Sequence, residues 1–600
     1  MLKVSHLVKE YTTAHGKKRV LDDLSFEISK AEIVGITGKS GSGKTTLLKI
    51  LRGVESFDAG EIEIDGEKIH PDSGKAGEKI LRQATAIHLQ RNFGLWSGPA
   101  IENIIRRLNF HLVGTESLPL PDHYTYQDLY DEALDILKMV HLDSKALHST
   151  DQLSGGEKQR LVLARQIAAR PKFMLLDEPV TMTGPDTKQE ILDVILELKE
   201  KLGIPILVVS HLPEIHAYIA DRVMLLENGK IAMEGDPVTV LKSFLKEMKP
   251  QESLLEVAVL KPCIRAKNVS RRYSLIRVGE VLNIQNLNFD IYEKQITTFI
   301  GSSGAGKTTV MKLLEGMVPP TSGNIEILYR AHESGAKINE EANEEGDERS
   351  GEGDADVGKW INIGAYNENR IYLRSVMSIM NQEFSMSVNS TVRDQIRFRL
   401  SMKTRYAVDV AKERAAEFGI PPQVLDIIYR LPDMTTDEKD TVMGELGIPD
   451  DIFSQLFPMF PSSDVNEYAA PIFKALDLPL EILDQKPDQI SGGEHVRAFI
   501  ALSLVTSPDY LFLDEPFGDL DPVTLRDVTN ALKRINKEFG TTIVMVSHHM
   551  DFVKEASHRA IWIDKGAIVM DGDPKTVCAD FVQKSNAKYL DFDIKKLMQE

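Results

Sequence analysis

The sequence contains only two cysteines, Cys263 and Cys578, in 600 residues. This excludes a disulfide scaffold, a cysteine-rich zinc module and an iron–sulfur cluster ligated by cysteines of this chain. No apolar run approaches the roughly 18 residues that a membrane helix needs. The first residues, MLKVSHLVKEY, also lack the apolar core of a secretory signal. We therefore expect a cytoplasmic protein with no transmembrane segment.

Positive charge is scarce relative to negative charge: 71 Lys and Arg residues stand against 90 Asp and Glu, for a net charge of -19. Such a surface repels phosphate backbones and disfavours nonspecific nucleic-acid binding. The hydrophobic share of 42% and the charged share of 27% are those of an ordinary globular protein. We expect no direct contact to nucleic acid and no membrane insertion.

One ordered set of motifs occurs twice along the chain. The first set is GKSGSGKT (38–45), LSGGE (153–157), MLLDEP (174–179) and SH (210–211). The second set is GSSGAGKT (301–308), ISGGE (490–494), LFLDEP (511–516) and SHH (547–549). Tandem duplication of one unit explains the shared order. We expect domain 1 over residues 1–248, a short polar linker over 249–260 and domain 2 over 261–600.

Domain 2 is the longer of the two, and its extra length falls in two places. An acidic, Gly-rich insertion at about 335–356 has no apolar periodicity, which predicts a solvated loop. An enlarged helical subdomain is expected at about 400–486, because that stretch has helical character interrupted by Pro and Gly. Within the second segment, the part near residues 451–470 is the better candidate for docking a partner.

Each Gly-rich motif follows a short apolar run and precedes a helical pattern, the context that indicates a phosphate-binding loop. Glycines let backbone N–H groups surround phosphate oxygens, and the helix directs its positive end at the same anion. We expect Lys44 and Lys307 to reach the β- and γ-phosphates of a nucleotide, and Thr45 and Thr308 to ligate Mg²⁺. The nucleotide-binding candidates here are Gly38, Lys39, Ser40, Gly41, Ser42, Gly43, Lys44, Thr45 and Thr46, with Gly301, Ser302, Ser303, Gly304, Ala305, Gly306, Lys307, Thr308 and Thr309.

The MLLDE and LFLDE segments are typical of buried strands that end in two acids. Adjacent strand residues point to opposite sides, so the two acids can address different atoms. We expect Asp177 and Asp514 to hold Mg²⁺ through water. Glu178 and Glu515 would then orient the attacking water, and His211 and His548, after the next apolar runs, would contact the γ-phosphate. The alternative for the acids is that they only cap the following turn.

With the LSGGE and ISGGE segments added, both repeats resemble the nucleotide-binding domains of ABC ATPases, and the resemblance covers nearly the whole chain. It implies an α/β fold of two tandem P-loop domains, each a RecA-like core with an antiparallel β subdomain and a helical subdomain. It also implies further binding residues. These are Tyr11 and Tyr273 for adenine, Gln90 and Gln382 for Mg²⁺ and coupling, and the signature residues Ser154, Gly155, Gly156, Ser491, Gly492 and Gly493.

In this family ATP is held between two domains packed head to tail, so a single chain with both halves suffices for two composite sites. Site one would combine Lys44, Glu178 and His211 with Ser491, Gly492 and Gly493. Site two would combine Lys307, Glu515 and His548 with Ser154, Gly155 and Gly156. The cofactors implied are ATP and Mg²⁺, and the implied reaction is ATP hydrolysis.

Two departures from the family pattern predict that the sites are unequal. Thr183 and Gly184 stand where Leu and Asp are usual, whereas the second repeat keeps Leu520-Asp521-Pro522. His495 and Val496 replace the common Lys-Gln pair after the second signature. The first loop normally couples the two sites, so its change places the difference at site two.

The MNQEFSMSVNSTVRDQI segment, the acidic insertion and the enlarged subdomain resemble component A2 of the methyl-coenzyme M reductase activation system of methanogenic archaea. That resemblance implies a soluble ATPase that assembles with this nickel enzyme and with iron–sulfur electron carriers. Two alternatives remain open: the ATPase subunit of an ABC importer with separate membrane subunits, and an ATP-gated scaffold with little turnover. The joint of about a dozen residues disfavours translation factors with long charged linkers.

Overall fold

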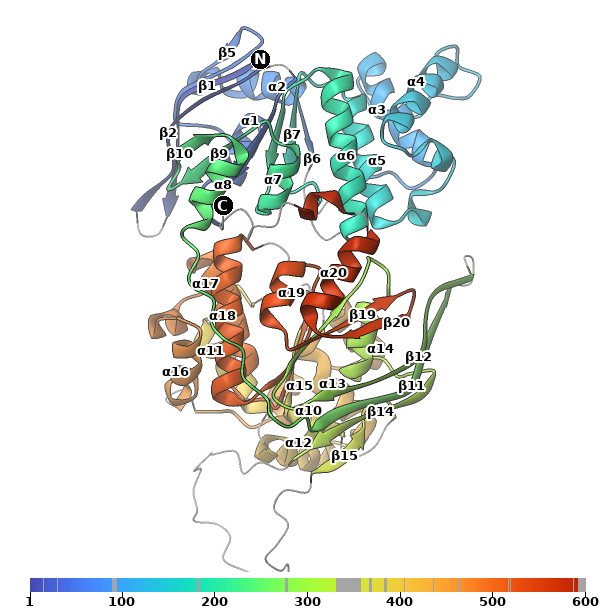
Figure 1. Cartoon of the computed structure of the whole chain (residues 1–600), viewed down its shortest axis with the longest axis vertical. Helices are drawn as coiled ribbons and strands as arrows, with labels where there is room; N and C mark the ends of the chain where they lie inside the picture. Colours follow the sequence, from blue (N-terminus) through green and yellow to red (C-terminus); the bar gives the residue numbers. More distant parts are fainter. Residues whose placement is uncertain are drawn as a thin grey trace, which may run out of the picture. The chain divides into compact units, whose positions relative to one another are not determined.

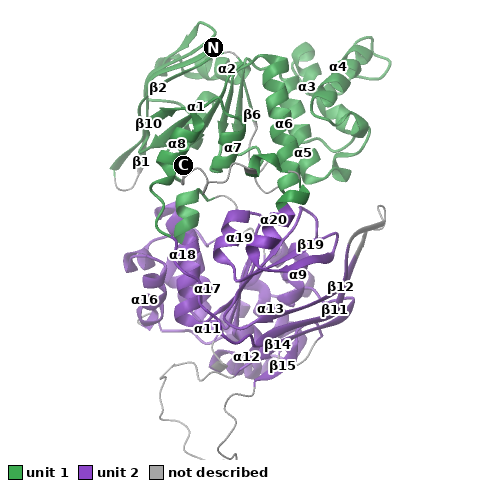
Figure 2. Ribbon diagram, viewed as in Figure 1, with its two compact units in different colours: residues 1–250, 519–527, 582–600 green, residues 251–518, 528–581 purple. Residues whose placement is uncertain are grey.

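The computed structural model describes residues 1–591 apart from several short gaps. Outside the described part are 14–15, 30, 89–93, 181–183, 276–278, 331–357, 366–369, 382–385, 404, 435, 450, 462–463, 516, 518–519, 586 and 592–600. The expected acidic insertion lies among these residues. By its internal contacts the chain divides into two compact units (Figure 2). Unit 1 is Met1–Pro250, Asp519–Asp527 and Val582–Glu600, and unit 2 is Gln251–Gly518 and Val528–Phe581.

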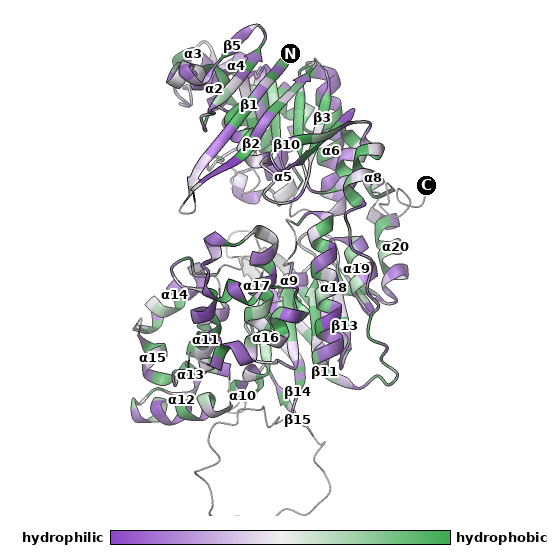
Figure 3. Ribbon diagram, turned by 90° about the vertical axis from the view of Figure 1, so that its left-hand side faces the viewer, coloured by the Kyte–Doolittle hydropathy of each residue, from purple (hydrophilic) through white to green (hydrophobic). Residues whose placement is uncertain are grey.

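The core of unit 1 is a six-stranded sheet in the order β10-β9-β3-β8-β7-β6. Its strands are β3 (Ile33–Thr37), β6 (Thr85–His88), β7 (Phe173–Asp177), β8 (Ile206–Val209), β9 (Arg222–Glu227) and β10 (Lys230–Gly235). All neighbours pair in parallel except β9 and β10. Every residue of β3 is buried, as in the middle of a parallel sheet, and green marks the hydrophobic residues of these inner strands in Figure 3.

A second, antiparallel sheet of unit 1 has the order β2-β1-β4-β5. It comprises β1 (Leu2–Thr13), β2 (Gly16–Ile28), β4 (Ala59–Ile64) and β5 (Glu67–Ile69). The helices are α1 (Lys44–Leu51), α2 (Gly74–Ala84), α3 (Ala100–Val113), α4 (Tyr126–Met139), α5 (Gly155–Ala168), α6 (Pro185–Leu202), α7 (Pro213–Ile219) and α8 (Pro237–Leu245). Helices α3, α4 and α5 pack on one another as a helical subdomain (Figure 1).

Unit 2 repeats this plan, with the corresponding strand order β16-β17-β18-β13-β19-β20 in its six-stranded sheet and β12-β11-β14-β15 in its antiparallel sheet. The core strands are β13 (Ile296–Ile300), β16 (Met377–Met380), β17 (Tyr510–Asp514), β18 (Thr542–Val546), β19 (Arg559–Asp564) and β20 (Ala567–Gly572). The antiparallel strands are β11 (Pro262–Leu275), β12 (Gly279–Tyr292), β14 (Ser322–Tyr329) and β15 (Lys359–Asn362). The predicted fold class is confirmed in both halves.

The helices of the second repeat lie between residues 307 and 585. They are α9 (Lys307–Leu314), α10 (Arg370–Ser375), α11 (Val392–Lys403), α12 (Arg405–Glu417), α13 (Pro422–Arg430), α14 (Thr436–Leu446), α15 (Ile452–Leu456), α16 (Val465–Ala475), α17 (Gly492–Leu504), α18 (Pro522–Phe539), α19 (Met550–Ala556) and α20 (Pro574–Ser585). An aromatic and aliphatic core holds α12, α13 and α15 together. Among the helices of the described residues, none has the length and apolarity needed to cross a membrane.

The segment after Pro250, expected to be a linker, is packed against unit 2. The backbone N–H of Glu252 donates to Asn530 Oδ1 at 3.1 Å, and Lys533 Nζ donates to the Glu252 carbonyl at 2.8 Å. At the other end of the chain, Tyr589 is 2% exposed within the core of unit 1. Its backbone N–H donates to Gln189 Oε1 at 3.0 Å. Ala587 and Tyr589 thus belong to the core of unit 1.

Candidate functional site

The Gly-rich loop of the first repeat connects β3 to α1, as the sequence predicts. Gly38, Gly41 and Gly43 have φ values of 145°, 80° and 107°, which L-residues with a side chain rarely adopt. A Cβ on Gly38 would also lie 2.3 Å from the Leu226 carbonyl oxygen of β9. Glycine is therefore required here both by the backbone turn and by the neighbouring strand.

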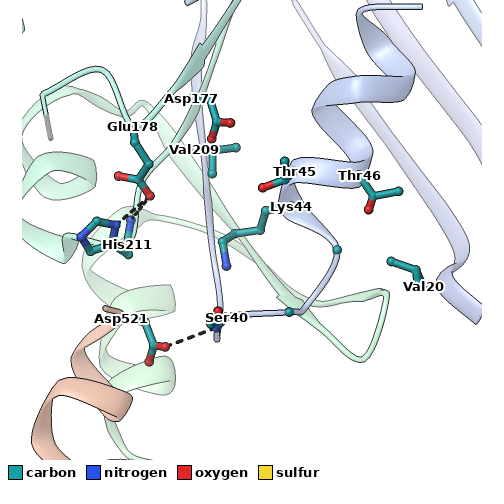
Figure 4. Close-up of a pocket in the computed structure, with 12 residues that line it drawn as sticks. Val20, Ser40, Lys44, Thr45, Thr46, Asp177, Glu178, Val209, His211 and Asp521 are labelled. Atoms are coloured by element: carbon teal, nitrogen blue, oxygen red, sulfur yellow. Dashed lines mark hydrogen bonds and ion pairs between the residues drawn. The ribbon is translucent and has the colours of Figure 1, made fainter. Parts of the chain in front are cut away.

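Lys44 closes over this loop. Its Nζ donates to the carbonyls of Gly38 at 2.8 Å and Lys39 at 2.9 Å. Burial lowers the pKa of Lys44, and the nearby carboxylates of Glu178, Asp521 and Asp177 partly offset that effect. The ammonium lies at the centre of the loop (Figure 4). A bound phosphate oxygen would replace the two carbonyls as the acceptor of the Lys44 hydrogen bonds.

Two acids lie where β7 ends. Burial and then the charge of Glu178 raise the pKa of Asp177 to about 6. Glu178 has φ of 50°, and its N–H donates to the Val209 carbonyl of β8 at 3.0 Å. The turn to positive φ sends the Glu178 side chain away from that of Asp177 (Figure 4). The two carboxylates therefore address different positions, and the cause is this turn beyond the end of β7 and not the alternation of strand residues.

His211 holds the Glu178 carboxylate. Its Nδ1 lies 2.8 Å from Glu178 Oε1, and its backbone N–H donates to the same oxygen at 3.0 Å (Figure 4). Ser210 Oγ donates to Oε2 at 3.3 Å. Burial raises the pKa of Glu178, but the charge and hydrogen bond of His211 lead a larger opposing effect, so the pKa is lowered. Glu178 is therefore ionised and oriented near neutral pH.

These residues line one cavity of unit 1, with a volume of about 490 Å³ (Figure 4). The backbone N–H of Ser40 at its edge donates to Asp521 Oδ2 at 3.2 Å. A carboxylate thus already lies against the loop whose N–H groups are suited to phosphate. The cavity is lined by Val20, Ser40, Gly41, Gly43, Lys44, Thr45, Thr46, Asp177, Glu178, Val209, His211 and Asp521.

The second repeat places the equivalent side chains together around the loop between β13 and α9. Lys307 Nζ donates to the carbonyls of Gly301 and Ser302, at 2.9 and 3.0 Å. Thr308 Oγ1 donates to Asp514 Oδ1 at 3.4 Å, and burial followed by the charge of Glu515 raises the Asp514 pKa to about 6.

The acid and histidine after β17 and β18 repeat the pairing of Glu178 with His211. His548 Nδ1 lies 3.3 Å from Glu515 Oε2, and Glu515 has φ of 47°. Glu515 N–H donates to the Val546 carbonyl of β18 at 3.1 Å. The same unusual backbone conformation therefore holds the same acid in both repeats.

The donor sets fit a Mg²⁺ ion. A threonine hydroxyl and a carboxylate converge in the second repeat, and Thr45 and Asp177 line the same cavity in the first. Within the described part of the chain, no group of three or more His, Cys, Asp or Glu side chains is arranged to hold a metal ion. Mg²⁺ takes one or two protein ligands and completes its shell with phosphates and water, so one hydroxyl and one carboxylate would be sufficient protein ligands.

The signature serines begin α5 and α17. Ser154 Oγ accepts from the N–H of Glu157 at 3.3 Å, while Ser154 N–H donates to Glu157 Oε2 at 2.8 Å. Ser491 and Glu494 form the same reciprocal capping box. This local bonding explains the Ser-Gly-Gly-Glu spacing in terms of helix formation and leaves both serines on the surface.

The remaining predicted residues do not line this cavity or lie outside the described residues. Tyr11 lies on β1 with the Lys9 ammonium 5.1 Å from its ring centre, and it does not belong to the cavity lining. Tyr273 lies on β11, and its side chain is outside the described residues. Gln90, Gln382 and Thr183 are also outside them. Gly184 is the N-cap of α6.

The sequence did not indicate Val20 and Val209 as cavity-lining residues, nor His216, which lies directly behind the Ser210–His211 turn. Valines in strands carry no chemical signal. His216 could have been noticed as a histidine in an apolar helix of the first repeat where the second repeat has Val553.

Comparisons with known proteins point to one family. The family model described as ABC transporter matches residues 21–181 and 284–518. The uncharacterized ABC transporter ATP-binding protein MJ1662 of Methanocaldococcus jannaschii is 43% identical over 593 residues, 98% of this chain and 99% of that protein. MJ1242 of the same archaeon is 28% identical over 609 residues, 95% of this chain and 96% of that protein.

Shorter or more distant similarities exist as well. The methionine import ATP-binding protein MetN of Bacillus subtilis is 32% identical over 248 residues, 41% of this chain and 69% of that protein. A crystal structure of the archaeal ribosome recycling factor aABCE1 with the stalk protein aP1 matches with a TM-score of 0.54 at 16% identity, over 96% of this chain and 92% of that one. At 16% identity this match shows only that the two chains share the tandem fold.

Proposed function

This chain belongs to the ABC transporter family as a tandem ATPase, and on that premise we propose that it binds two ATP molecules and uses their hydrolysis to remodel a partner protein. The observation that carries the proposal is the recurrence of one geometry. In each repeat a loop lysine, a strand-end Asp and a Glu paired with a histidine surround one phosphate-binding loop. Each set contains what phosphoryl transfer to water needs: a phosphate cradle, a metal ligand and an oriented carboxylate.

Thr45 with Asp177, and Thr308 with Asp514, would hold Mg²⁺ in the two sites. When bound, the ion neutralises charge on the β- and γ-phosphates. Glu178 and Glu515 would orient the attacking water, and His211 and His548 would fix these carboxylates and contact the γ-phosphate. In this proposal Ser491 to Gly493 complete site one and Ser154 to Gly156 complete site two. ATP then acts as the link between the repeats.

The energy available to such a switch is sufficient. At ATP about 100-fold above its dissociation constant, one bound nucleotide contributes roughly 2.7 kcal/mol to the state that binds it. Two sites contribute about 5.5 kcal/mol, enough to move an open–closed equilibrium from about 1:99 to 99:1. Hydrolysis of ATP removes the γ-phosphate and with it this contribution.

The proposed partner is methyl-coenzyme M reductase, within an activation complex that contains iron–sulfur proteins, in the cytoplasm of a methanogenic archaeon. Support comes from the features of the second repeat and from the archaeal source of two relatives that match over nearly their full length. The second candidate is an importer ATPase, which the similarity of one repeat to a methionine import ATP-binding protein favours.

Two experiments test the proposal. The double variant Glu178→Gln with Glu515→Gln is expected to retain ATP and to lose phosphate release, because the phosphate cradles remain intact. Phosphate release at the parental rate would refute the catalytic assignment. Affinity capture of the tagged chain from archaeal extract is expected to recover the nickel enzyme from the soluble fraction. Capture of membrane subunits would favour the importer.

A further inference from the structure

His216 is a completely buried histidine on α7, behind the turn that carries Ser210 and His211. Its Nε2 lies 2.8 Å from the Ser210 carbonyl oxygen. Burial lowers the pKa of His216, so the ring is neutral near pH 7 and carries one proton. A carbonyl can only accept, so that proton is on Nε2 and the ring donates to Ser210.

The other side of the ring lies against Gly35 in the middle of β3. A Cβ on Gly35 would be 2.4 Å from His216 Nδ1. Within the described residues Nδ1 has no hydrogen-bond partner. The absence of a side chain at Gly35 therefore provides the space for the imidazole, and among the described residues the ring is hydrogen-bonded to the turn alone.

That turn is the one that holds the hydrolytic carboxylate. Ser210 Oγ donates to Glu178 Oε2, and the next residue, His211, contacts Glu178 Oε1 through ring and backbone. A donor fixed on the Ser210 carbonyl limits rotation of the peptide unit between Ser210 and His211. That peptide unit includes the N–H that binds Glu178.

The second repeat fills the corresponding space between strand and helix without a histidine. Thr298 stands at the position of Gly35 and Val553 at that of His216. Thr298 Oγ1 lies 2.6 Å from Ser557 Oγ, where the first repeat has Ala220. At these three positions the second repeat thus has a Thr–Ser contact and a valine, where the first repeat has an imidazole bonded to the Ser210 carbonyl.

We propose that His216 is a positioning residue of the first ATPase site, which acts through its Nε2–H bond to Ser210 to hold the turn that orients Glu178 and His211. We call this hydrogen bond the His216 clamp, and the second site lacks it because Val553 has no donor. The inference rests on the proposed ATPase function and assigns one physical source of inequality between the two sites.

The test uses the full chain with Glu515→Gln, so that turnover reports site one. His216→Asn loses a donor at the Nε2 position, whereas His216→Gln retains one there. We expect His216→Asn to lower kcat by about threefold to tenfold, the rate equivalent of one hydrogen bond, with unchanged KM for ATP. His216→Gln is expected to stay within about twofold of its parent.

A second variant, here called the transplant, tests the inference even if His216→Asn fails to fold. The triple change Gly35→Thr, His216→Val and Ala220→Ser copies the packing of the second repeat and removes only the clamp. It is expected to melt like its parent and to show the same loss of kcat. Parental kcat in a folded transplant, or a loss confined to KM, would overturn the inference.

Hydrogen–deuterium exchange without nucleotide separates this inference from the proposed function. Amide exchange at His211 and Leu212 should be faster in the transplant than in its parent. If the parent hydrolyses no ATP, the proposed function fails, while faster exchange would still support the clamp. Unchanged exchange in the folded transplant would refute the clamp by itself.

Discussion

The carboxylate oxygen Oε1 of Glu178 lies 2.8 Å from His211 Nδ1 and accepts the backbone N–H of the same residue at 3.0 Å. Both contacts come from the second residue after β8, so the position of the acid depends on the register between β7 and β8. The histidine also offsets the burial that raises the Glu178 pKa. The pair therefore determines both where the carboxylate points and whether it is charged.

His211→Ala is expected to raise the pKa of Glu178, because burial remains while the leading stabilising group is lost. In a Glu515→Gln background, the acidic limb of the kcat profile should move to higher pH, and kcat near pH 7 should fall roughly 10²-fold. Steady-state phosphate release across pH 5 to 9 measures both. An acidic limb at the same pH as the parent would contradict the role assigned to His211.

The two sites are expected to turn over at different rates, because the second repeat has Asp521 where the first has Gly184 and Val553 where the first has His216. Glu178→Gln leaves site two active and Glu515→Gln leaves site one active. Phosphate release by each single variant gives the two rates, and the double variant supplies the background. Equal residual rates would count against inequality of the sites.

Asp177→Asn should stabilise the nucleotide-free chain above about pH 6. The folded-state pKa of about 6 lies above the value near 3.9 expected when unfolded, so the folded chain binds the proton more tightly. Stability conferred by the protonated form is thus lost as pH rises from about 4 to about 6. The loss is at most about 3 kcal/mol.

Thermal melts without Mg²⁺ or nucleotide check this sign. The variant should melt higher than the parent at pH 8 and nearly equally at pH 4, because the neutral amide matches the protonated acid. A parent that gains stability from pH 4 to pH 8 relative to the variant would show that the burial cost has been assigned the wrong sign.

Gly155→Ala and Gly156→Ala form a matched pair within the first signature. An added Cβ at Gly155 meets no atom within 4 Å, whereas one at Gly156 would lie 2.1 Å from Thr187 Cγ2 of α6. Gly155→Ala should therefore keep the parental melting temperature and lower ATP turnover roughly tenfold or more by crowding a bound phosphate. Gly156→Ala should lower the melting temperature itself. Full turnover in Gly155→Ala would remove this loop from the nucleotide site.

Tyr589→Ala tests whether the segment around Tyr589 stabilises unit 1. Removal of a buried aromatic side chain from a packed core costs about 3–5 kcal/mol, and Tyr589 is 2% exposed. Tyr124→Ala, at a residue 86% exposed, is the control and should change stability little. Urea denaturation with fragments resolved by limited proteolysis would assign the loss to unit 1. An unchanged unfolding midpoint would mean that this contact contributes no stability.

The sequence by itself determined the duplication, the two phosphate loops and the acids at the strand ends. These features are local: a strand, a Gly-rich turn and a helix follow one another along the chain, so their spacing records the chemistry. Only the tertiary structure decided that His216 lies between Gly35 and Ser210, that Ser40 meets Asp521 and that Tyr589 enters the core of unit 1. Along the sequence, Gly35 and His216 are 181 positions apart, Ser40 and Asp521 are 481 apart, and Gln189 and Tyr589 are 400 apart. They depend on strand order and on the volume left by neighbouring side chains, which no local pattern encodes.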